Sequence, residues 1–389
     1  MNTIIQPGQI GSPEGMNPAP DELQDDSGND IFYASKSRLM WLRFKQHKVA
    51  LFSAVMICLF YLVAIFANFI SVKDIDSFSA KFKYVPPTEI HFFDEEGNFT
   101  RPYIYNLDRK INMETLEYEY TQGDTTYPIK FWHKGYSYKF LWLFETDRHL
   151  MGVDDGAALF LMGSDKLGRD IFSKVVHGAR ISLSIGLVGV FLSLVFGVIL
   201  GGISGFYGGK VDTFIQRMIE VLMSFPSIPL WMALAASLPP HWSPLIVYFM
   251  ITLILSLIGW TGIARVVRGI VMRLKEEKYT EAALLSGAGN FYIIRKHLLP
   301  GATSFVIAHA TLSIPAMIIA ETSLSFLGIG LRPPVVSWGV LLQEAQSVTV
   351  IANYPWILYP AFFVIATVLF FNFLGDGLRD AADPYMNRA

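Results

Sequence analysis

The sequence predicts an all-α integral membrane protein with six transmembrane helices and a small, partly β external insertion between the first two. The 389-residue chain is 52% hydrophobic and only 16% charged, and its mean hydropathy is +0.39. This composition is far more apolar than that of a typical soluble domain. Six separate segments are also long and apolar enough to cross a bilayer, whereas residues 71–178 mix charges, aromatics and turn formers.

The six predicted spans each contain about 20 mostly apolar residues. In chain order they are Val49–Ile70, Ile181–Phe206, Phe214–Leu238, Leu245–Ala264, Thr303–Phe326 and Tyr354–Leu374. Lys and Arg residues precede the first span and follow the fourth, whereas the short turn between the third and fourth spans carries none. By the positive-inside rule, we therefore expect both termini on the cytoplasmic side.

This topology divides the chain into consecutive parts. They are a disordered cytoplasmic tail (1–35), an amphipathic segment with the first span (36–70), an external insertion (71–178), a core of five spans (179–376) that includes a cytoplasmic loop (265–302), and a cytoplasmic C-terminal tail (377–389). The first part is polar and lacks the apolar region of a signal peptide. Within the insertion, TLEYEYTQGDTTYPIKFW predicts two strands around a Gly-Asp turn.

Several function classes are disfavoured by composition. The formal net charge of -2 creates no global field for a nucleic-acid partner. Cys58 is the single cysteine, so no intramolecular disulfide can form. The histidines of the insertion lack metal-ligand spacing, so we expect no metal site. GFYGGK, from Gly205 to Lys210, lacks the residues that a phosphate loop requires at two positions and indicates a tight turn instead. No pattern of catalytic residues is evident.

Glycines recur at every fourth residue in the second span, at Gly197, Gly201 and Gly205. A stripe of small residues lets membrane helices approach closely. The stripe therefore predicts close packing, either within this chain or against another subunit.

Three residues in or near the spans are candidates for a pathway or gating role. Pro226 and Pro229 remove backbone donors and should bend the third helix, and bent helices often line cavities. Glu321 lies in the fifth span, where a carboxylate is a functional candidate by default. Glu220 is less informative, because Arg217 precedes it by three residues on the same helix face and can pair with it.

The stretch from Tyr279 to Pro300 is as long as a span but is expected to stay outside the bilayer. Crossing would invert the later spans and bring charged residues into the bilayer edge. The composition predicts a helix over Glu276–Ser286, a break at Gly287–Gly289 and a second short helix over Phe291–Leu299, stopped before Pro300. Such a helix pair cannot bury its own apolar side, so it needs either a protein partner or the lipid interface.

The same stretch resembles the EAA loop of ABC-importer permeases. Glu281-Ala282-Ala283 is followed after three residues by Gly287, and nine residues then precede His297, which stands where the usual pattern has Ile. Leu299-Pro300 completes the pattern.

Other segments are similar to the dipeptide/oligopeptide/nickel permease family, specifically its C-type member. They are MGSDKLGRDIFSKVVHGARISL (Met162–Leu183), GFYGGKVD (Gly205–Asp212), LSFLGIGLRPPVVSWG (Leu324–Gly339) and LGDGLRDAADP (Leu374–Pro384). The resemblance is loose over Lys36–Val72 and close over Leu161–Pro384. It does not extend to Ser71–Phe160, so no family role is carried over to that stretch.

The resemblance implies a type I ABC-importer permease fold in the bacterial inner membrane. It also implies a homologous B-type permease, two ABC ATPase subunits and an external solute-binding protein as partners, with ATP and Mg bound by the ATPases rather than by this chain. The site residues that it implies for the ATPase contact are Glu281, Ala282, Ala283, Gly287, Leu299 and Pro300.

The expected function is import of di- or oligopeptides by a non-catalytic permease subunit. The same machinery could import nickel chelates or another small solute. Two other classes stay open, an ion-coupled secondary transporter and a membrane-anchored adaptor whose external segment is the working part.

Overall fold

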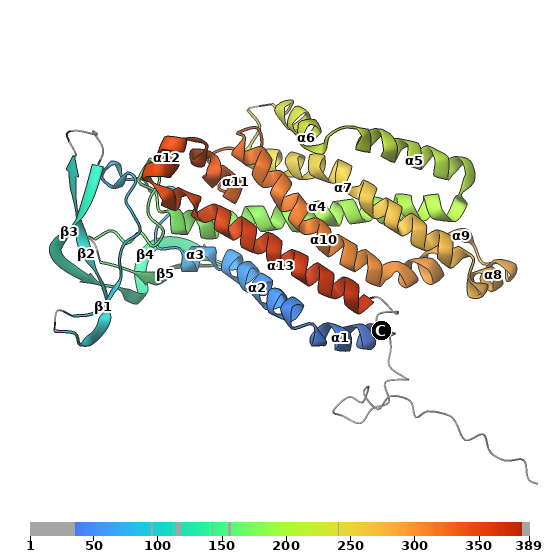
Figure 1. Ribbon diagram of the computed structural model, residues 1–389, viewed down its shortest axis with the longest axis horizontal. Helices are drawn as coiled ribbons and strands as arrows, with labels where there is room; N and C mark the ends of the chain where they lie inside the picture. Colours follow the sequence, from blue (N-terminus) through green and yellow to red (C-terminus); the bar gives the residue numbers. More distant parts are fainter. Residues whose placement is uncertain are drawn as a thin grey trace, which may run out of the picture.

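The computed structural model describes residues 36–94, 96–111, 113, 118–141, 143–154, 157–239 and 241–382. The predicted N-terminal tail and residues 383–389 of the predicted C-terminal tail lie outside this part of the chain. Long helices form an elongated bundle, the β-strands lie together at one end of it, and α8 and α9 lie at the other (Figure 1).

Five helical segments are long and apolar enough to cross a membrane, and a bent pair of helices makes a sixth, within the residues that the structure describes. The long helices are α2 (Lys48–Ile65), α4 (Ile171–Tyr207), α7 (Pro244–Lys275), α10 (Leu299–Phe326) and α13 (Tyr359–Ala382). Several extend past the predicted spans, since hydropathy reports only the apolar part of a helix. α4, for example, starts at Ile171, where the Asp170 carboxylate caps it by accepting from the Ser173 amide at 2.8 Å. α4 therefore begins ten residues before the predicted second span, which starts at Ile181.

The predicted third span is the bent pair. α5 (Gly209–Ser224) and α6 (Ser227–Ala236) meet at an angle of 85°. Pro226 stands directly before α6, so the predicted proline bend is confirmed there. Pro229 lies inside the first turn of α6, where a proline removes no helical hydrogen bond. Both prolines are exposed.

The insertion folds into two antiparallel sheets. One contains β1 (His91–Phe93), β2 (Phe99–Ile111) and β3 (Tyr118–Pro128) in that order, and the other pairs β4 (Lys130–Phe140) with β5 (Phe144–Gly152). The prediction of a strand pair around Gly123-Asp124 is wrong. These residues lie within β3, where the register with β2 shifts. Gly and Asp suit a β-bulge as well as a turn, and only the pairing with β2 distinguishes the two.

Shorter elements complete the chain. α1 (Lys36–Gln46) packs near the end of α13, and α3 (Ala67–Ile70) extends α2 toward the sheets (Figure 1). Between α10 and α13 the chain forms α11 (Trp338–Leu341), η5 (Leu342–Gln346), α12 (Val348–Asn353) and η6 (Pro355–Leu358), which lie at the sheet end. The 3₁₀ turn η3 (Ala80–Phe82) precedes the first sheet.

The glycine stripe packs inside this chain, against α7. A Cβ added to Gly201 would lie 2.4 Å from the Ala264 carbonyl oxygen, and one added to Gly197 would lie 2.6 Å from the Ile263 Cβ. Gly205 similarly faces the backbone of Arg268. Of the two interpretations of the stripe, close packing within the chain is therefore confirmed.

The loop at Gly208-Gly209 joins α4 to α5 in a tight turn, as the sequence predicts. Both glycines have positive φ angles, of 65° and 52°. This conformation costs a glycine little. The turn brings α5 back along α7 and sets the position of the bent pair.

Candidate functional site

The stretch from Tyr279 to Pro300, which we call the coupling segment, lies at the end of the bundle opposite the sheets (Figure 1). Its first helix, α8 (Lys278–Leu285), begins shortly after α7 ends. The buried Thr280 hydroxyl donates to the Leu274 carbonyl at 2.8 Å. This bond fixes the angle at which α8 leaves α7.

The turn after α8 has the geometry of a glycine helix cap. Gly287 has a φ of +77°, and the amide of Ala288 donates to the Ala283 carbonyl at 3.1 Å across it. That hydrogen bond with a left-handed glycine defines a Schellman motif. The predicted break between two helices at Gly287 is therefore confirmed.

The second half of the segment differs from the prediction. A short α9 (Asn290–Ile293) continues through the π turn η4 (Ile294–Leu298) directly into α10. Pro300 does not stop a helix but lies in the first turn of α10. Proline fits there because the first helical amides have no intrahelical acceptor. Leu299 is half-buried at the same junction.

One side of the coupling segment is anchored in the core. Ile293 and Leu298 are fully buried and pack against Val267 and Val271 of α7. The ring of His297 lies beside Tyr279 and Tyr292, with centroid distances of 6.3 and 5.8 Å. Histidine thus serves as a packing residue at the position where the family pattern has Ile.

The other side presents apolar residues that no described part of the chain covers. Leu285 is 84% exposed and Phe291 is 75% exposed, on either side of the glycine turn. Glu281 and Ala282 are also exposed, whereas Ala283 is half-buried. Sequence reasoning missed Leu285 and Phe291 as site residues, although two large apolar residues flanking a predicted glycine break were the available signal. We call this exposed surface of α8 and α9 the coupling surface.

An ion pair braces the bundle next to the coupling surface. Arg268 of α7 donates from Nε and Nη2 to the two carboxylate oxygens of Asp212, each at 2.6 Å. Paired hydrogen bonds of this kind also fix relative orientation. On the exposed face of α5, the predicted pair of Arg217 and Glu220 is confirmed at 2.7 Å.

Glu321 is fully buried near the sheet end of α10. Its carboxylate accepts from the hydroxyls of Ser337 at 2.7 Å, Ser325 at 2.8 Å and Ser182 at 3.3 Å. The Ser182 hydroxyl in turn accepts from the Trp338 amide at 3.1 Å. Glu321 therefore links α4 and α10 to the start of α11 and is enclosed by protein in this conformation.

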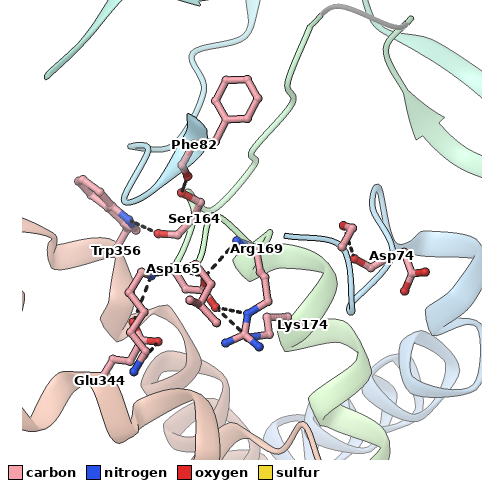
Figure 2. Close-up of polar contacts among 11 residues, drawn as sticks. Asp74, Phe82, Ser164, Asp165, Arg169, Lys174, Glu344 and Trp356 are labelled. Atoms are coloured by element: carbon pink, nitrogen blue, oxygen red, sulfur yellow. Dashed lines mark hydrogen bonds and ion pairs between the residues drawn. The ribbon is translucent and has the colours of Figure 1, made fainter. Parts of the chain in front are cut away.

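A second polar cluster joins the loop before α4 to the elements between α10 and α13 (Figure 2). The Asp165 carboxylate accepts from Arg169 Nε at 2.7 Å and from the buried Lys174 Nζ at 2.9 Å. Lys166 pairs with Glu344 of η5 at 3.7 Å. These residues border a cavity of about 190 Å³.

The pKa values of the two acids in this cluster, Asp165 and Glu344, are shifted in opposite directions. Burial alone would raise the pKa of Asp165, but Lys174 and Arg169 together hold that pKa below its ordinary value of 3.8. Burial and the nearby charge of Asp165 raise the pKa of Glu344. The cluster is therefore a partly buried charge network that stays bonded through Asp165 at neutral pH.

The same loop is tied to its surroundings by neutral hydrogen bonds. The Trp356 indole donates to the Ser164 carbonyl at 3.2 Å, and the Ser164 hydroxyl donates to the Phe82 carbonyl at 2.6 Å (Figure 2). The rings of Tyr84 and Tyr354 stack with centroids 4.0 Å apart. The segment GSDKLGRD thus connects the insertion to the bundle, a structural role that sequence reasoning did not assign.

Two family models match the chain. Residues 197–388 match the binding-protein-dependent transport system inner membrane component, and residues 35–87 match the N-terminal transmembrane domain of oligopeptide transport permease C. Both sheets, from His91 to Gly152, lie between these matched ranges.

Curated relatives agree with these matches. The chain is 41% identical over 227 residues to the dipeptide transport system permease protein DppC of Bacillus subtilis, covering 58% of this chain and 69% of the relative. It is 40% identical over 223 residues to the oligopeptide transport system permease protein OppC of Haemophilus influenzae, covering 57% and 69%. A third relative, the glutathione transport system permease protein GsiD of Pectobacterium atrosepticum, is 41% identical over 223 residues, covering 57% and 72%.

Proposed function

The chain belongs to the binding-protein-dependent inner membrane permeases, as a C-type subunit of the oligopeptide and dipeptide branch, and we propose that it forms half of the pathway for peptides entering the cell. The other half is a homologous B-type permease. An external solute-binding protein delivers the peptide. Two cytoplasmic ATPase subunits bind ATP and Mg and supply the energy, so this chain catalyses no reaction.

The observation that carries this proposal is the coupling surface. Leu285 and Phe291 are large, apolar and mostly exposed on a short helix pair outside the spans. An exposed apolar patch on a rigid support is typical of a protein contact. We assign this contact to a groove on an ATPase subunit, with Glu281, Ala282 and Ala283 on the same helix and Gly287 setting the turn.

Leu299 and Pro300 act on this contact indirectly in our proposal. They start α10, so a movement of the coupling segment reaches the sheet end of the bundle through one continuous helix. Glu321 lies near that far end and is hydrogen-bonded to α11. A tilt of α10 would therefore act on the elements between α10 and α13.

The orientation follows from the same contact. With the ATPases in the cytoplasm, α8 and α9 face the cytoplasm, and so do α1 and the end of α13. Both termini are then cytoplasmic, and the sheets are external. The basic residues that flank the spans favour this orientation by the positive-inside rule.

We propose peptides as the substrate because the relatives described above are named as dipeptide, oligopeptide and glutathione permeases. An ion-coupled carrier would need an acid within a span that can exchange protons with water. Glu321 is enclosed by serine hydroxyls instead.

The test replaces Leu285 with Asp in the intact complex reconstituted in vesicles. A charge at the centre of an apolar contact is left without a partner, and substitution of a central interface residue typically costs on the order of 2 kcal/mol of binding or more. We expect ATPase association to weaken at least tenfold and ATP-dependent peptide uptake to fall with it.

The matched control is Val348→Asp. Val348 is 81% exposed, like Leu285, but lies in α12 at the opposite end. It should leave ATPase association unchanged. Equal ATPase association in the L285D variant and the wild type would contradict the proposed role of the coupling surface.

A further inference from the structure

The turn between β4 and β5 is strongly apolar, although it lies outside the spans. Its sequence reads FLWLF from Phe140 to Phe144, and Trp142 at its centre lies outside the described residues. Leu143 is 73% exposed and Phe144 is 69% exposed. The Leu143 amide donates to the Phe140 carbonyl at 3.0 Å, so the turn is closed by a backbone bond. Large apolar side chains exposed together at one turn are typical of contact with another protein or with a membrane.

The hairpin of β4 and β5 points along the first span toward the bilayer. The Phe66 ring, at the junction of α2 and α3, lies 5.8 Å from the ring of Phe140 beside the turn. Phe69, one helical turn farther from α2, lies 5.3 Å from Trp132 near the base of the hairpin. Phe69 also lies 6.5 Å from Phe140. The hairpin therefore runs beside α3, and the ring next to its turn, Phe140, is the one that reaches Phe66 at the end of α2.

The exposed face of α2 leads directly to this hairpin. Exposed apolar residues recur along α2 at intervals of three and four, at Phe52, Val55, Leu59 and Leu62. Residues at these intervals share one face of a helix, and the same spacing next reaches Phe66 and Phe69. The 18 residues of α2 extend about 27 Å, close to the roughly 30 Å of bilayer hydrocarbon. α3 and the tip of the hairpin are therefore placed where the hydrocarbon ends.

A groove of about 510 Å³ separates α3 from the hairpin. Aromatic rings dominate its lining: Phe66, Phe69, Trp132, Tyr138, Phe140 and Phe144. Arg148 also borders the groove, with about half of its side chain exposed while Nη1 donates to the Trp132 carbonyl at 3.0 Å. Arg148 also pairs with Asp147 at 3.8 Å. The groove thus combines an apolar, mostly aromatic lining with an arginine at its edge.

We propose that the β4–β5 turn is inserted into the bilayer beside the first span, and that the groove behind it holds an acyl chain of a phospholipid. Lys139 and Glu145 face each other immediately before the apolar turn and mark the limit of insertion. A lysine there can extend its ammonium group to the phosphate layer. Arg148 faces the phosphate of the bound lipid. A lipid is favoured over a protein because the groove continues the outward apolar face of a membrane-spanning helix.

The insertion of the turn is tested with a fluorescent label in the intact complex, held in phosphatidylcholine nanodiscs. The native Cys58 is replaced by Ser, and Leu143→Cys carries the label. The matched control is Thr125→Cys, an exposed position on β3 of the other sheet. Lipids that carry a nitroxide near the headgroup should quench the label at L143C several-fold more than the label at T125C. Aqueous iodide should quench the label at L143C several-fold less than the label at T125C.

Two results would overturn the insertion. Label at L143C that is as accessible to iodide as label at T125C places the turn in water. Label that is protected from both quenchers places it under another protein subunit. Wild-type peptide uptake by the same two labelled complexes, reconstituted separately in sealed vesicles, serves as the check that the variants are correctly folded.

The groove is tested through Trp132. Phosphatidylcholine with brominated acyl chains quenches tryptophan only on contact. We expect such lipid to quench the wild-type complex more than a Trp132→Phe complex, since the variant lacks the groove fluorophore and keeps an aromatic ring. Equal quenching of the two complexes would show that no acyl chain occupies the groove.

Discussion

Replacing Gly201 with Ala should separate two helices that the fold holds in backbone contact. The new Cβ would lie 2.4 Å from the carbonyl oxygen of Ala264 and 2.9 Å from its Cα. These are backbone atoms, so no side-chain rotation can relieve the overlap. α4 must then move away from α7 by about 1 Å to restore an ordinary contact distance.

The adjacent Gly202 is a matched control. An alanine Cβ there meets only the Ile294 Cγ2, at 4.0 Å, which is an ordinary contact. Overpacking of a tight interface typically costs about 1–3 kcal/mol, whereas Ala in an open helical position gains up to about 1 kcal/mol over Gly. We therefore expect G201A to unfold at a clearly lower temperature than G202A.

Thermal unfolding of the detergent-solubilised complex, followed by size-exclusion chromatography of heated samples, measures the difference. G202A should match or exceed the wild type, and G201A should fall below both. If G201A and G202A unfold at the same temperature, the close approach of α4 and α7 does not contribute to stability as argued.

The remaining predictions concern three buried or strained positions. Replacing Asp165 with Asn leaves the buried Lys174 without its carboxylate, and breaking a buried pair costs about 3 kcal/mol or more in thermal or denaturant unfolding. In the folded state, the pKa of Asp165 is depressed below its ordinary value of 3.8. The ionised carboxylate therefore contributes its full share to the free energy of unfolding above pH 3.8, and this share is lost as the pH falls through the folded-state pKa. Over that pH range, the stability of the wild type should decline more steeply than that of D165N. Replacing Glu321 with Leu removes the acceptor for three serine hydroxyls and should cost about 1–3 kcal/mol of stability for each hydroxyl left unsatisfied. Replacing it with Gln retains an acceptor and should cost less. Equal unfolding temperatures of the E321L and E321Q variants would contradict this reasoning. Replacing Gly287 with Val puts a β-branched residue at a φ of +77°, which costs about 1–3 kcal/mol locally; ATP-dependent uptake should fall while the subunit still inserts, and wild-type uptake would refute the importance of the turn.

The helices of this protein could be predicted from local patterns. Apolar runs locate the spans because a spanning helix satisfies its own backbone bonds. The glycine spacing predicted one side of a close helix contact but left its partner open, and the EAA pattern with its glycine turn located the coupling segment. Pro226 located the bend between α5 and α6. The spans, the glycine turn and the proline bend are each decided within a few turns of one chain segment, whereas the partner of the glycine stripe is decided by tertiary packing.

Other features depended on distant partners and were missed. The strands in the insertion were predicted as one hairpin, because Gly123-Asp124 suits a turn and a bulge equally well. The end of the coupling segment was placed before Pro300, since a proline can either follow a helix or begin one. Pairing with β2 decides between a turn and a bulge at Gly123-Asp124, and packing against α7 decides how the coupling segment joins α10.

Taken alone, the sequence determined the membrane class, the span positions and the glycine, proline and EAA patterns that mark the coupling segment. Tertiary structure decided which surfaces remain uncovered. Leu285 and Phe291 are prominent only because Ile293 and Leu298 occupy the inner side, and the aromatic groove exists only because the β4–β5 hairpin lies beside α3. Local propensity acts through the backbone of one segment, whereas exposure depends on what every other segment has already covered.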